Sequence, residues 1–429
     1  MPAHAPLIEH FLLAARSSEI RTLDQLAQSC QLVTSACELI HELQRERGIS
    51  NIYLASGGKR FGTEREQQRK RSDTAERHFH DYLRHVQEGD SRLWGSASLF
   101  HRIARVLLQL EDLPELRKGI GDQTLDTATS TEAWSGLIAG LLAIIFEAAD
   151  IATDSEISQA LVALFHFLQA KEHTGQERAW GSVGFATGRF DPELQARLQH
   201  LRDSQQRCLD VFIRFGGESE RAKWSEIEAS SGTAELVRLR WIVDGFDPAS
   251  PIPAGISEIW FAVATERIDR MRDVEQQLSA SLLAMAQSRL EQARKALQEN
   301  RSRLQAEPDA ESEPVSPLSL LLESSEGKSA SLSPSGSVRA LYDLLQEQAE
   351  HLQQMSDQLE EARSALTERK LIERAKGILM QYQGLTEEQA YRRLRESAMQ
   401  ANCRLVAVAE KVLGAVEGSV PGRASPGSH

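Results

Sequence analysis

A long stretch without proline, Ile256 to Asn300, constrains the fold of this chain more than any other feature. It predicts a single helix on the order of 65 Å long, because each helical residue adds ~1.5 Å along the axis. The beginning of the stretch is largely apolar and its end is polar. A helix of that kind can carry a structural change out of a buried bundle.

The sequence before this stretch is also predicted to be mostly helical. The runs Leu23 to Leu43 and Leu194 to Phe212 place apolar residues at the three- and four-residue spacing of one helix face. Prolines are sparse and gather at 248–253, where a break between helices is expected. Residues 20–305 are therefore expected to form a helical-bundle domain, and the whole chain an all-α fold.

Membrane insertion and secretion are not expected. The most apolar run, Ser135 to Phe146, is too short to cross a bilayer, so a buried core helix is the better interpretation. The first twenty residues lack a signal-peptide pattern. The four cysteines have no metal-binding spacing. We expect a cytoplasmic protein with reduced thiols, no membrane contact, no metal site and no cofactor.

Residues 306–337 mark the clearest boundary between domains. This segment is rich in Ser, Pro, Glu and Gly. Such a composition buries too little apolar surface to order itself, so a flexible linker is predicted. The tail, residues 416–429, is expected to be disordered.

Residues 338–415 predict a long coiled-coil helix followed by a small three-helix bundle. Gly384 is expected to end the long helix, Val338 to Gln383. Thr386 and Gln389 predict a capping box for a second helix, and Asn402 is expected to cap a third, Cys403 to Leu413. The coiled-coil seam consists of leucines at seven-residue spacing: Leu345, Leu352, Leu359 and Leu366. The seam either pairs two chains as a homodimer or packs on the N-terminal domain of the same chain.

Charge is distributed unevenly along the chain. The formal net charge of −13 taken alone argues against binding to nucleic acid. Residues 363–411, however, hold ten lysines and arginines against six acidic residues. A local basic surface is what phosphate contacts require, so RNA binding by this segment is possible within an acidic protein.

A set of spaced motifs lies in the same segment: Arg369, Ile372-Glu373, Ala375-Lys376-Gly377 with Met380, Ala390-Tyr391, Leu394-Arg395, Ala398-Met399, and Asn402 through Ala409. In these motifs the segment resembles the ANTAR family of RNA-binding antiterminator domains. The resemblance implies a helical domain that binds a paired-hairpin element in a nascent leader mRNA. By blocking a terminator, such a domain acts on the RNA polymerase elongation complex only indirectly.

The residues expected to contact RNA are cations that can converge when the helices fold back, and a helical glycine that permits close approach to the backbone. They are Arg369, Lys376, Gly377, Arg392, Arg395 and Arg404. The alternative for the cations is a solvated helix face with intrahelical ion pairs, such as Glu373 with Lys376. Tyr391 can stack on a base, but a core position is the preferred interpretation.

The N-terminal part contains an internal repeat. Residues 44–61 read QRERGISNIYLASGGKRF and residues 175–190 read GQERAWGSVGFATGRF. Glu46-Arg47 aligns with Glu177-Arg178, and both units end in a basic residue and Phe after glycine. Two similar helix-plus-turn units are therefore predicted.

These repeats, together with WFAVATERIDRMRDVE at 260–275, resemble the NIT domain, a helical module that senses nitrate and nitrite. A NIT domain followed by an ANTAR domain is typical of nitrate-responsive transcription antiterminators of the NasR type. The resemblance implies nitrate or nitrite as ligand and leader mRNA hairpins as partner.

Arginine suits such a ligand. Nitrate is planar and singly charged, and the planar fork of a guanidinium donates to two oxygens at once. Arg47 and Arg178 hold equivalent places in the repeats and are the first candidates. Family analogy adds Arg240, with Arg238 close behind, and Arg45 is a weaker candidate. The alternative for Arg47 is a structural salt bridge with a carboxylate on a facing helix.

No catalytic motif is present, so an enzyme is not expected; GGKRFG at 57–62, for example, lacks P-loop spacing. The leading hypothesis is a two-state switch in which the anion frees the C-terminal domain to bind RNA. Two alternatives remain: a response to another small anion or a partner protein, and a helical adaptor that binds no RNA.

Overall fold

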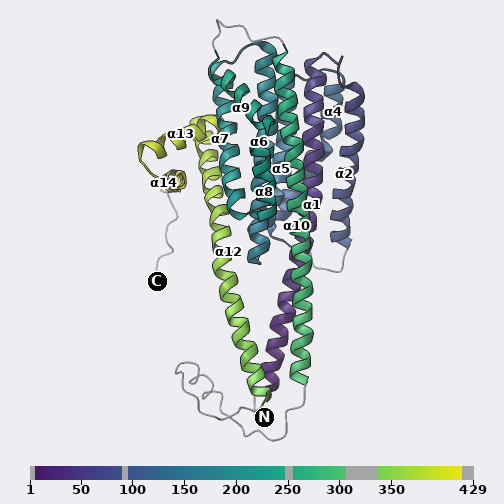
Figure 1. The fold of residues 1–429 in the computed structure, drawn as a ribbon, viewed down its shortest axis with the longest axis vertical. Helices are drawn as coiled ribbons and strands as arrows, with labels where there is room; N and C mark the ends of the chain where they lie inside the picture. Colours follow the sequence, from purple (N-terminus) through teal and green to yellow (C-terminus); the bar gives the residue numbers. More distant parts are fainter. Residues whose placement is uncertain (1–4, 89–94, 247–254, 306–335, 418–429) are drawn as a thin grey trace, which may run out of the picture.

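The computed structural model describes residues 5–88, 95–246, 255–305 and 336–417, without the side chains of 5, 6, 8, 9, 303–358 and 388. Within these ranges the backbone consists of helices joined by turns and short loops, and no strand is present (Figure 1). The all-α prediction is therefore confirmed for the described chain. The predicted linker lies outside the described residues, except for its last two positions, where a helix begins, and so does the tail after Glu417.

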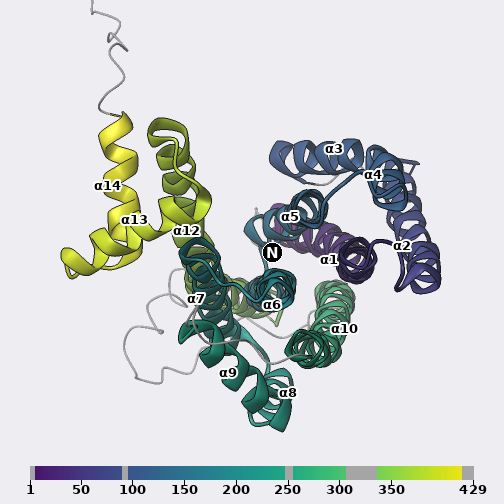
Figure 2. The ribbon, with the colours of Figure 1, turned by 90° about the horizontal axis from the view of Figure 1, so that it is seen from above.

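The N-terminal part consists of two helical bundles side by side (Figure 2). The first contains α1 (Ala5–Ala55), α2 (Gly62–Glu88), α3 (Ala97–Glu111), α4 (Leu113–Gly121) and α5 (Thr127–Asp150). The second contains α6 (Ser155–Thr187), α7 (Pro192–Phe215), α8 (Glu218–Glu228), α9 (Ser231–Asp244) and α10 (Ile256–Gln305). We call α1–α10 the double bundle. In each half, two short helices in succession form one side.

Local sequence explains where several of these helices begin. The side chains of Asp126, Asp154, Asp191 and Ser230 each accept a hydrogen bond from the backbone N–H three residues later. Such N-caps satisfy donors that the first turn of a helix leaves free. The two repeat units begin in the last turns of α1 and α6, and each continues through a glycine with positive φ, Gly57 or Gly188.

The apolar run at 135–146 lies in α5, and the prediction of a core helix fits its surroundings. By length and composition α5 could cross a membrane, but 61% of its apolar window is buried inside the structure. Trp134, Ile138 and Leu141 have no more than trace exposure and belong to the main core cluster. This is the environment of a helix packed inside a bundle.

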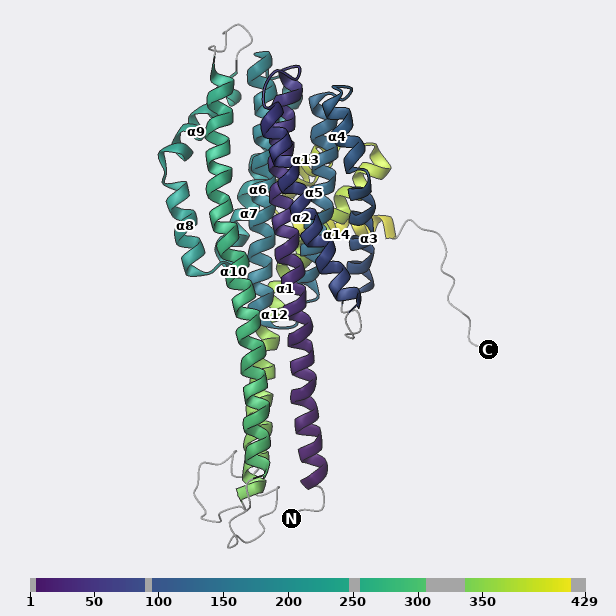
Figure 3. The ribbon, with the colours of Figure 1, turned by 90° about the vertical axis from the view of Figure 1, so that its right-hand side faces the viewer.

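The C-terminal part begins with α12 (Gly336–Gln383), which runs along the double bundle, and ends with α13 (Glu387–Gln400) and α14 (Leu405–Glu417). We call α12–α14 the C-terminal module. Beyond the two bundles, the first part of α1, the last part of α10 and the first part of α12 extend in the same direction (Figures 1 and 3). The three helices of the C-terminal module form a small core of their own near the C-terminal end of α12. It consists of Ala375, Leu379, Ala390, Leu394, Ala398, Val408, Ala409 and Leu413.

Most boundaries predicted for the C-terminal module are confirmed, and one is wrong. Gly384 ends α12 with a φ of 63°, and the capping box of Thr386 and Gln389 is present. The third helix, however, starts at Leu405 rather than at Cys403. Asn402 has a φ of 47° and lies in the turn, so it is not an N-cap, which requires extended backbone.

The described end of the leucine seam packs within one chain. Leu366 and Ala362 are fully buried in the main core cluster, together with residues of α1, α5 and α6. Leu345 and Leu352 lie where side chains are not described. Of the two uses predicted for the seam, packing on the N-terminal part is the one that the described residues adopt.

Candidate functional site

The two repeat arginines approach each other where α1 and α6 pack together. A Cβ added to Gly48 would lie within 3 Å of Nη2 of Arg178, and one added to Gly175 would lie 2.6 Å from Nη2 of Arg47. Each guanidinium therefore occupies space beside a glycine of the other helix. Both side chains are almost fully buried, with 1% of Arg47 and 8% of Arg178 exposed. The repeat thus places its two arginines together, away from bulk solvent.

Arg47 is held by a carboxylate of the facing helix. Its Nη1 donates to Oε1 of Glu172 at 2.5 Å and its Nη2 to Oε2 at 3.1 Å. Nη1 also donates to the hydroxyl of Ser135 in α5 at 2.8 Å. The structural salt bridge weighed as an alternative for Arg47 is therefore present, and its partner is Glu172.

Arg178 is less well compensated. Its Nη1 donates to the hydroxyl of Thr265 in α10 at 2.9 Å, and its guanidinium carbon lies 4.9 Å from the ring centre of Phe261. Among the described residues it forms no ion pair. Burial and then the charge of Arg47 lower the pKa of the Arg178 guanidinium to about 10. The charges of Asp269 and Glu172 oppose this shift, but Arg178 has no ion pair among the described residues, and such a buried cation attracts an anion.

A cavity of about 280 Å³ lies between α1, α2, α6 and α10 beside these arginines. Its inner wall is buried and basic, whereas its rim carries exposed charges of both signs. The lining includes His41, Gln44, Arg45, Arg47, Gly48, Glu64, Arg71, Lys171, Gly175, Arg178, Phe261, Thr265 and Asp269. Arg45, the weaker candidate, is therefore on the rim.

Lys171 brings a further buried cation to the inner wall. Its Nζ pairs with a carboxylate oxygen of Glu275 in α10 and lies 3.2 Å from Nδ1 of His41. Lys171 and Glu275 are both fully buried. Burial lowers the pKa of the Lys171 ammonium. Burial and then the charge of Lys171 lower the pKa of the His41 imidazole well below its usual range.

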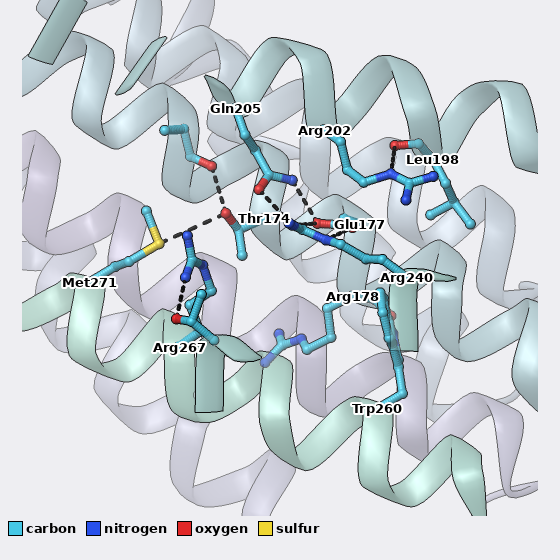
Figure 4. A network of polar contacts seen from close by, with 12 residues as sticks. Thr174, Glu177, Arg178, Leu198, Arg202, Gln205, Arg240, Trp260, Arg267 and Met271 are labelled. Atoms are coloured by element: carbon cyan, nitrogen blue, oxygen red, sulfur yellow. Dashed lines mark hydrogen bonds and ion pairs between the residues drawn. The ribbon is translucent and has the colours of Figure 1, made fainter. Parts of the chain in front are cut away.

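The acidic residue before each repeat arginine also has an equivalent role in the two halves. Glu177 accepts hydrogen bonds from Nε and Nη2 of Arg240 in α9, at 2.8 and 2.7 Å (Figure 4). Glu46 accepts from Nε and Nη2 of Arg117 in α4, at 2.7 and 2.9 Å. Arg240 is therefore one step removed from the cavity, because Glu177 stands on another face of α6 from Arg178.

Arg238 is not brought to the cavity in this structure. Its side chain is 72% exposed and pairs with Glu235 of the same helix at 3.1 Å. Of the four predicted ligand residues, the structure therefore brings together Arg47 and Arg178. Arg240 reaches the neighbouring Glu177, and Arg238 faces solvent.

The C-terminal module lies with part of its predicted RNA face against the double bundle. Tyr391 is 6% exposed; its ring centre lies 4.9 Å from that of His200 and 4.3 Å from the guanidinium carbon of Arg207, both in α7. Arg395 pairs with Asp203 of α7. Tyr391 is thus buried, but by another domain as well as by its own helices.

Contacts from α12 extend this interface between the C-terminal module and the double bundle, which we call the docking surface. Arg369 lies over the ring of Phe165 in α6, with its guanidinium carbon 5.0 Å from the ring centre. Lys370 donates to Asp150 of α5 at 2.6 Å. Two of the six predicted RNA-contacting residues, Arg369 and Arg395, are therefore engaged by the double bundle.

The other four predicted RNA residues lie within the module or on its surface. Lys376 is buried between Glu373 at 2.9 Å and Glu387 at 2.7 Å; burial opposes its charge, but these carboxylates raise its pKa. The intrahelical pair of Glu373 with Lys376 is the one that the ion-pair alternative predicts, whereas Arg404, just before α14, pairs with Glu368 of α12 at 2.5 Å. Gly377 and Arg392 are exposed, and nothing lies within 4 Å of a Cβ placed on Gly377.

Comparison with known proteins agrees with this arrangement. Residues 38–283 match the family model for nitrate and nitrite sensing (NIT), and residues 360–413 match the ANTAR domain. The nitrate regulatory protein of Klebsiella oxytoca is 34% identical over 418 residues, which cover 96% of each chain. The chain belongs to the NasR-type family of nitrate-responsive transcription antiterminators. A solved structure of the NasR transcription antiterminator covers 94% of this chain and 98% of its own, with a TM-score of 0.60 and 33% identity.

Membership of this antiterminator family makes the chain a regulator with a nitrate-sensing domain and an RNA-binding domain, not an enzyme. Sequence reasoning missed Lys171 and Phe261, which line the cavity, and Glu172, which holds Arg47 behind it. Glu172 and Arg47 are 125 positions apart, so no local pattern joins them. Arg117 was also missed. The repeat did contain a signal for it, because Glu46 and Glu177 are equivalent positions and an arginine partner for one implies an arginine partner for the other.

Proposed function

We propose that nitrate or nitrite binds in the cavity between Arg47 and Arg178 and thereby controls RNA binding by the C-terminal module. The observation that carries the proposal is the buried approach of these guanidiniums, one of them without an ion pair among the described residues. A trigonal monoanion supplies the missing negative charge. It also accepts hydrogen bonds from guanidinium N–H groups that lie in the plane of the guanidinium.

The docked arrangement is the state that does not bind RNA. The double bundle covers Tyr391 and engages Arg369 and Arg395, so these groups are not free to meet phosphates or bases. Asp203 and Asp150 supply the negative charge that RNA phosphates would otherwise provide. The acidic double bundle therefore competes with RNA for the same basic face.

Helix α6 connects the two sites. It carries Gly175 and Arg178 at the cavity, and Phe165 beneath Arg369 at the docking surface. An anion that binds more tightly to one arrangement of α1 and α6 than to the other shifts the population toward that arrangement. In the favoured state α6 no longer fits the C-terminal module, which is then released.

The released module binds a two-hairpin leader mRNA and prevents formation of the terminator. Exposed Arg392 and Gly377 form the contact face with Arg369 and Arg395, which lose their partners on release, and with Arg404, which pairs with Glu368 inside the module. Lys376 supports this face from within. Proteins bind RNA stem-loops through their phosphates, shape and loop bases. Cations that pair with phosphates and an exposed glycine that lets RNA approach the helix backbone suit this kind of recognition.

Calorimetry on the full-length protein tests the anion site. Nitrate and nitrite are expected to bind, whereas chloride and sulfate bind at least tenfold more weakly. Arg178→Ala is expected to abolish binding of nitrate, and Arg238→Ala, at the solvent-facing arginine, to leave it unchanged. Equal binding of nitrate by both variants would exclude this cavity as the ligand site.

A further inference from the structure

Glu172 is the buried carboxylate next to the two ligand arginines. It lies in α6, its side chain is 3% exposed, and both of its oxygens pair with Arg47. Side-chain amides of Gln44 and Gln176 donate to Oε2 and Oε1, each at 2.8 Å. Four donors thus surround the side chain of Glu172, directly behind Arg47 of the cavity wall.

The buried charges around this point leave one positive charge in excess. Arg47 and Arg178 contribute two positive charges, and Glu172 contributes one negative charge. The charge of Lys171 on the same wall is balanced by that of Glu275. Glu275 also forms an ion pair with Arg272, which lies on the more exposed side of α10. The rim residues Arg45, Glu64, Arg71 and Asp269 are exposed, so solvent and salt weaken their effect on the buried charges, including the attraction between Asp269 and Arg178.

We infer that Glu172 makes the cavity selective for singly charged over doubly charged oxyanions. This inference rests on the proposed anion site. A monoanion beside Arg178 neutralises the excess charge and leaves no buried charge unbalanced. A dianion such as sulfate leaves one negative charge unbalanced in a site that water barely reaches, which is strongly unfavourable.

Removal of this carboxylate tests the selectivity. In Glu172→Gln the amide keeps the shape of the side chain, but the two arginines then carry two uncompensated charges. By calorimetry at constant ionic strength, the ratio of nitrate to sulfate affinity is expected to fall at least tenfold relative to the original protein. Glu172→Asp keeps the charge and is expected to keep a ratio within threefold of the original.

Glu147→Gln is the matched control. Glu147 is also buried and also pairs with an arginine, Arg102 at 3.1 Å, but it lies twelve residues along α5 from Ser135, about 18 Å at 1.5 Å per residue. Its replacement is expected to leave the ratio unchanged. A ratio that changes equally in both glutamine variants, or in neither, would overturn the inference.

A second pair of variants tests the same charge count if Glu172→Gln does not fold. Arg47→Gln alone leaves no excess charge and is expected to lose nitrate binding. Adding Glu172→Gln restores one excess charge and is expected to recover at least tenfold in nitrate affinity. No recovery in the folded double variant overturns the role of Glu172. Failure of the original protein to bind nitrate overturns the anion site itself, so the two failures are distinguishable.

Discussion

The guanidinium of Arg178 occupies the space beside Gly48 that a side chain at that position would need. The nearest atom is Nη2, the far end of a flexible side chain, so a new Cβ displaces the guanidinium rather than a backbone. We predict that Gly48→Ala folds normally and gains up to ~1 kcal/mol from higher helix propensity. Calorimetry is expected to show at least tenfold weaker nitrate binding.

Gly136→Ala is the control for this prediction. It adds the same methyl group to the neighbouring helix α5, where nothing lies within 4 Å of the new Cβ. Nitrate affinity is expected to remain unchanged there. If Gly48→Ala binds nitrate as tightly as Gly136→Ala does, Arg178 is not placed by this contact.

The two repeat arginines, Arg47 and Arg178, are predicted to differ in their effect on stability. Arg47→Ala leaves Glu172 as a buried carboxylate without its cation, a loss expected to destabilise by ~3–5 kcal/mol. Arg178→Ala removes a buried charge that has no ion pair among the described residues, so the loss of packing is offset by relief from desolvation. Urea denaturation without ligand measures the change in the free energy of unfolding for both variants. Equal destabilisation by the two variants would contradict this difference in charge compensation.

Weakening the docking surface from the side of the double bundle is predicted to release RNA binding without nitrate. Asp203→Ala with Arg207→Ala removes the partner of Arg395 and the cation over Tyr391, while the C-terminal module stays intact. Each contact contributes up to about 1 kcal/mol, so an increase of about five- to thirtyfold in RNA affinity is expected in a gel shift. Asp210→Ala, an exposed acid on the same helix, is the control and leaves affinity unchanged. An unchanged affinity in the double variant would show that these contacts do not restrain the module.

Acid is predicted to destabilise the fold through buried histidines. His166 in α6 is fully buried; burial and then the charge of Arg369 lower its pKa to about 3, below the usual 6.5. The unfolded chain therefore binds a proton that the folded chain does not, and stability falls as the pH drops below 6.5. Between pH 7 and 5 this histidine alone contributes a loss of ~2 kcal/mol. In urea denaturation, His166→Asn is expected to show a shallower dependence on pH; an equal slope would assign the loss to other groups.

Much of the fold could be predicted because local rules decide it. The proline-free stretch does form α10, and Gly384, Thr386 and Gln389 place the ends of α12 and α13. The start of α14 was misplaced because Asn favours two different positions: N-caps, with extended backbone, and turns with positive φ. Asn402 adopts the second.

The candidate site was predictable only as far as the repeat extended. The equivalence of Glu46-Arg47 and Glu177-Arg178 brought two arginines into view, and the structure places them together. The partner of Arg47 and the covering of Tyr391 depend on helix packing between residues far apart in sequence, which periodicity does not specify. The family analogy that suggested Arg240 and Arg238 likewise could not show that Arg240 faces Glu177.

A gel shift with a two-hairpin leader RNA, with and without nitrate, tests the central claim most directly. The full-length protein is expected to bind this RNA at least tenfold more tightly when nitrate is present. Arg178→Ala is expected to bind it weakly under both conditions, because its cavity no longer holds the anion. RNA affinity that is independent of nitrate in the original protein, or a nitrate response that survives in Arg178→Ala, would contradict the account.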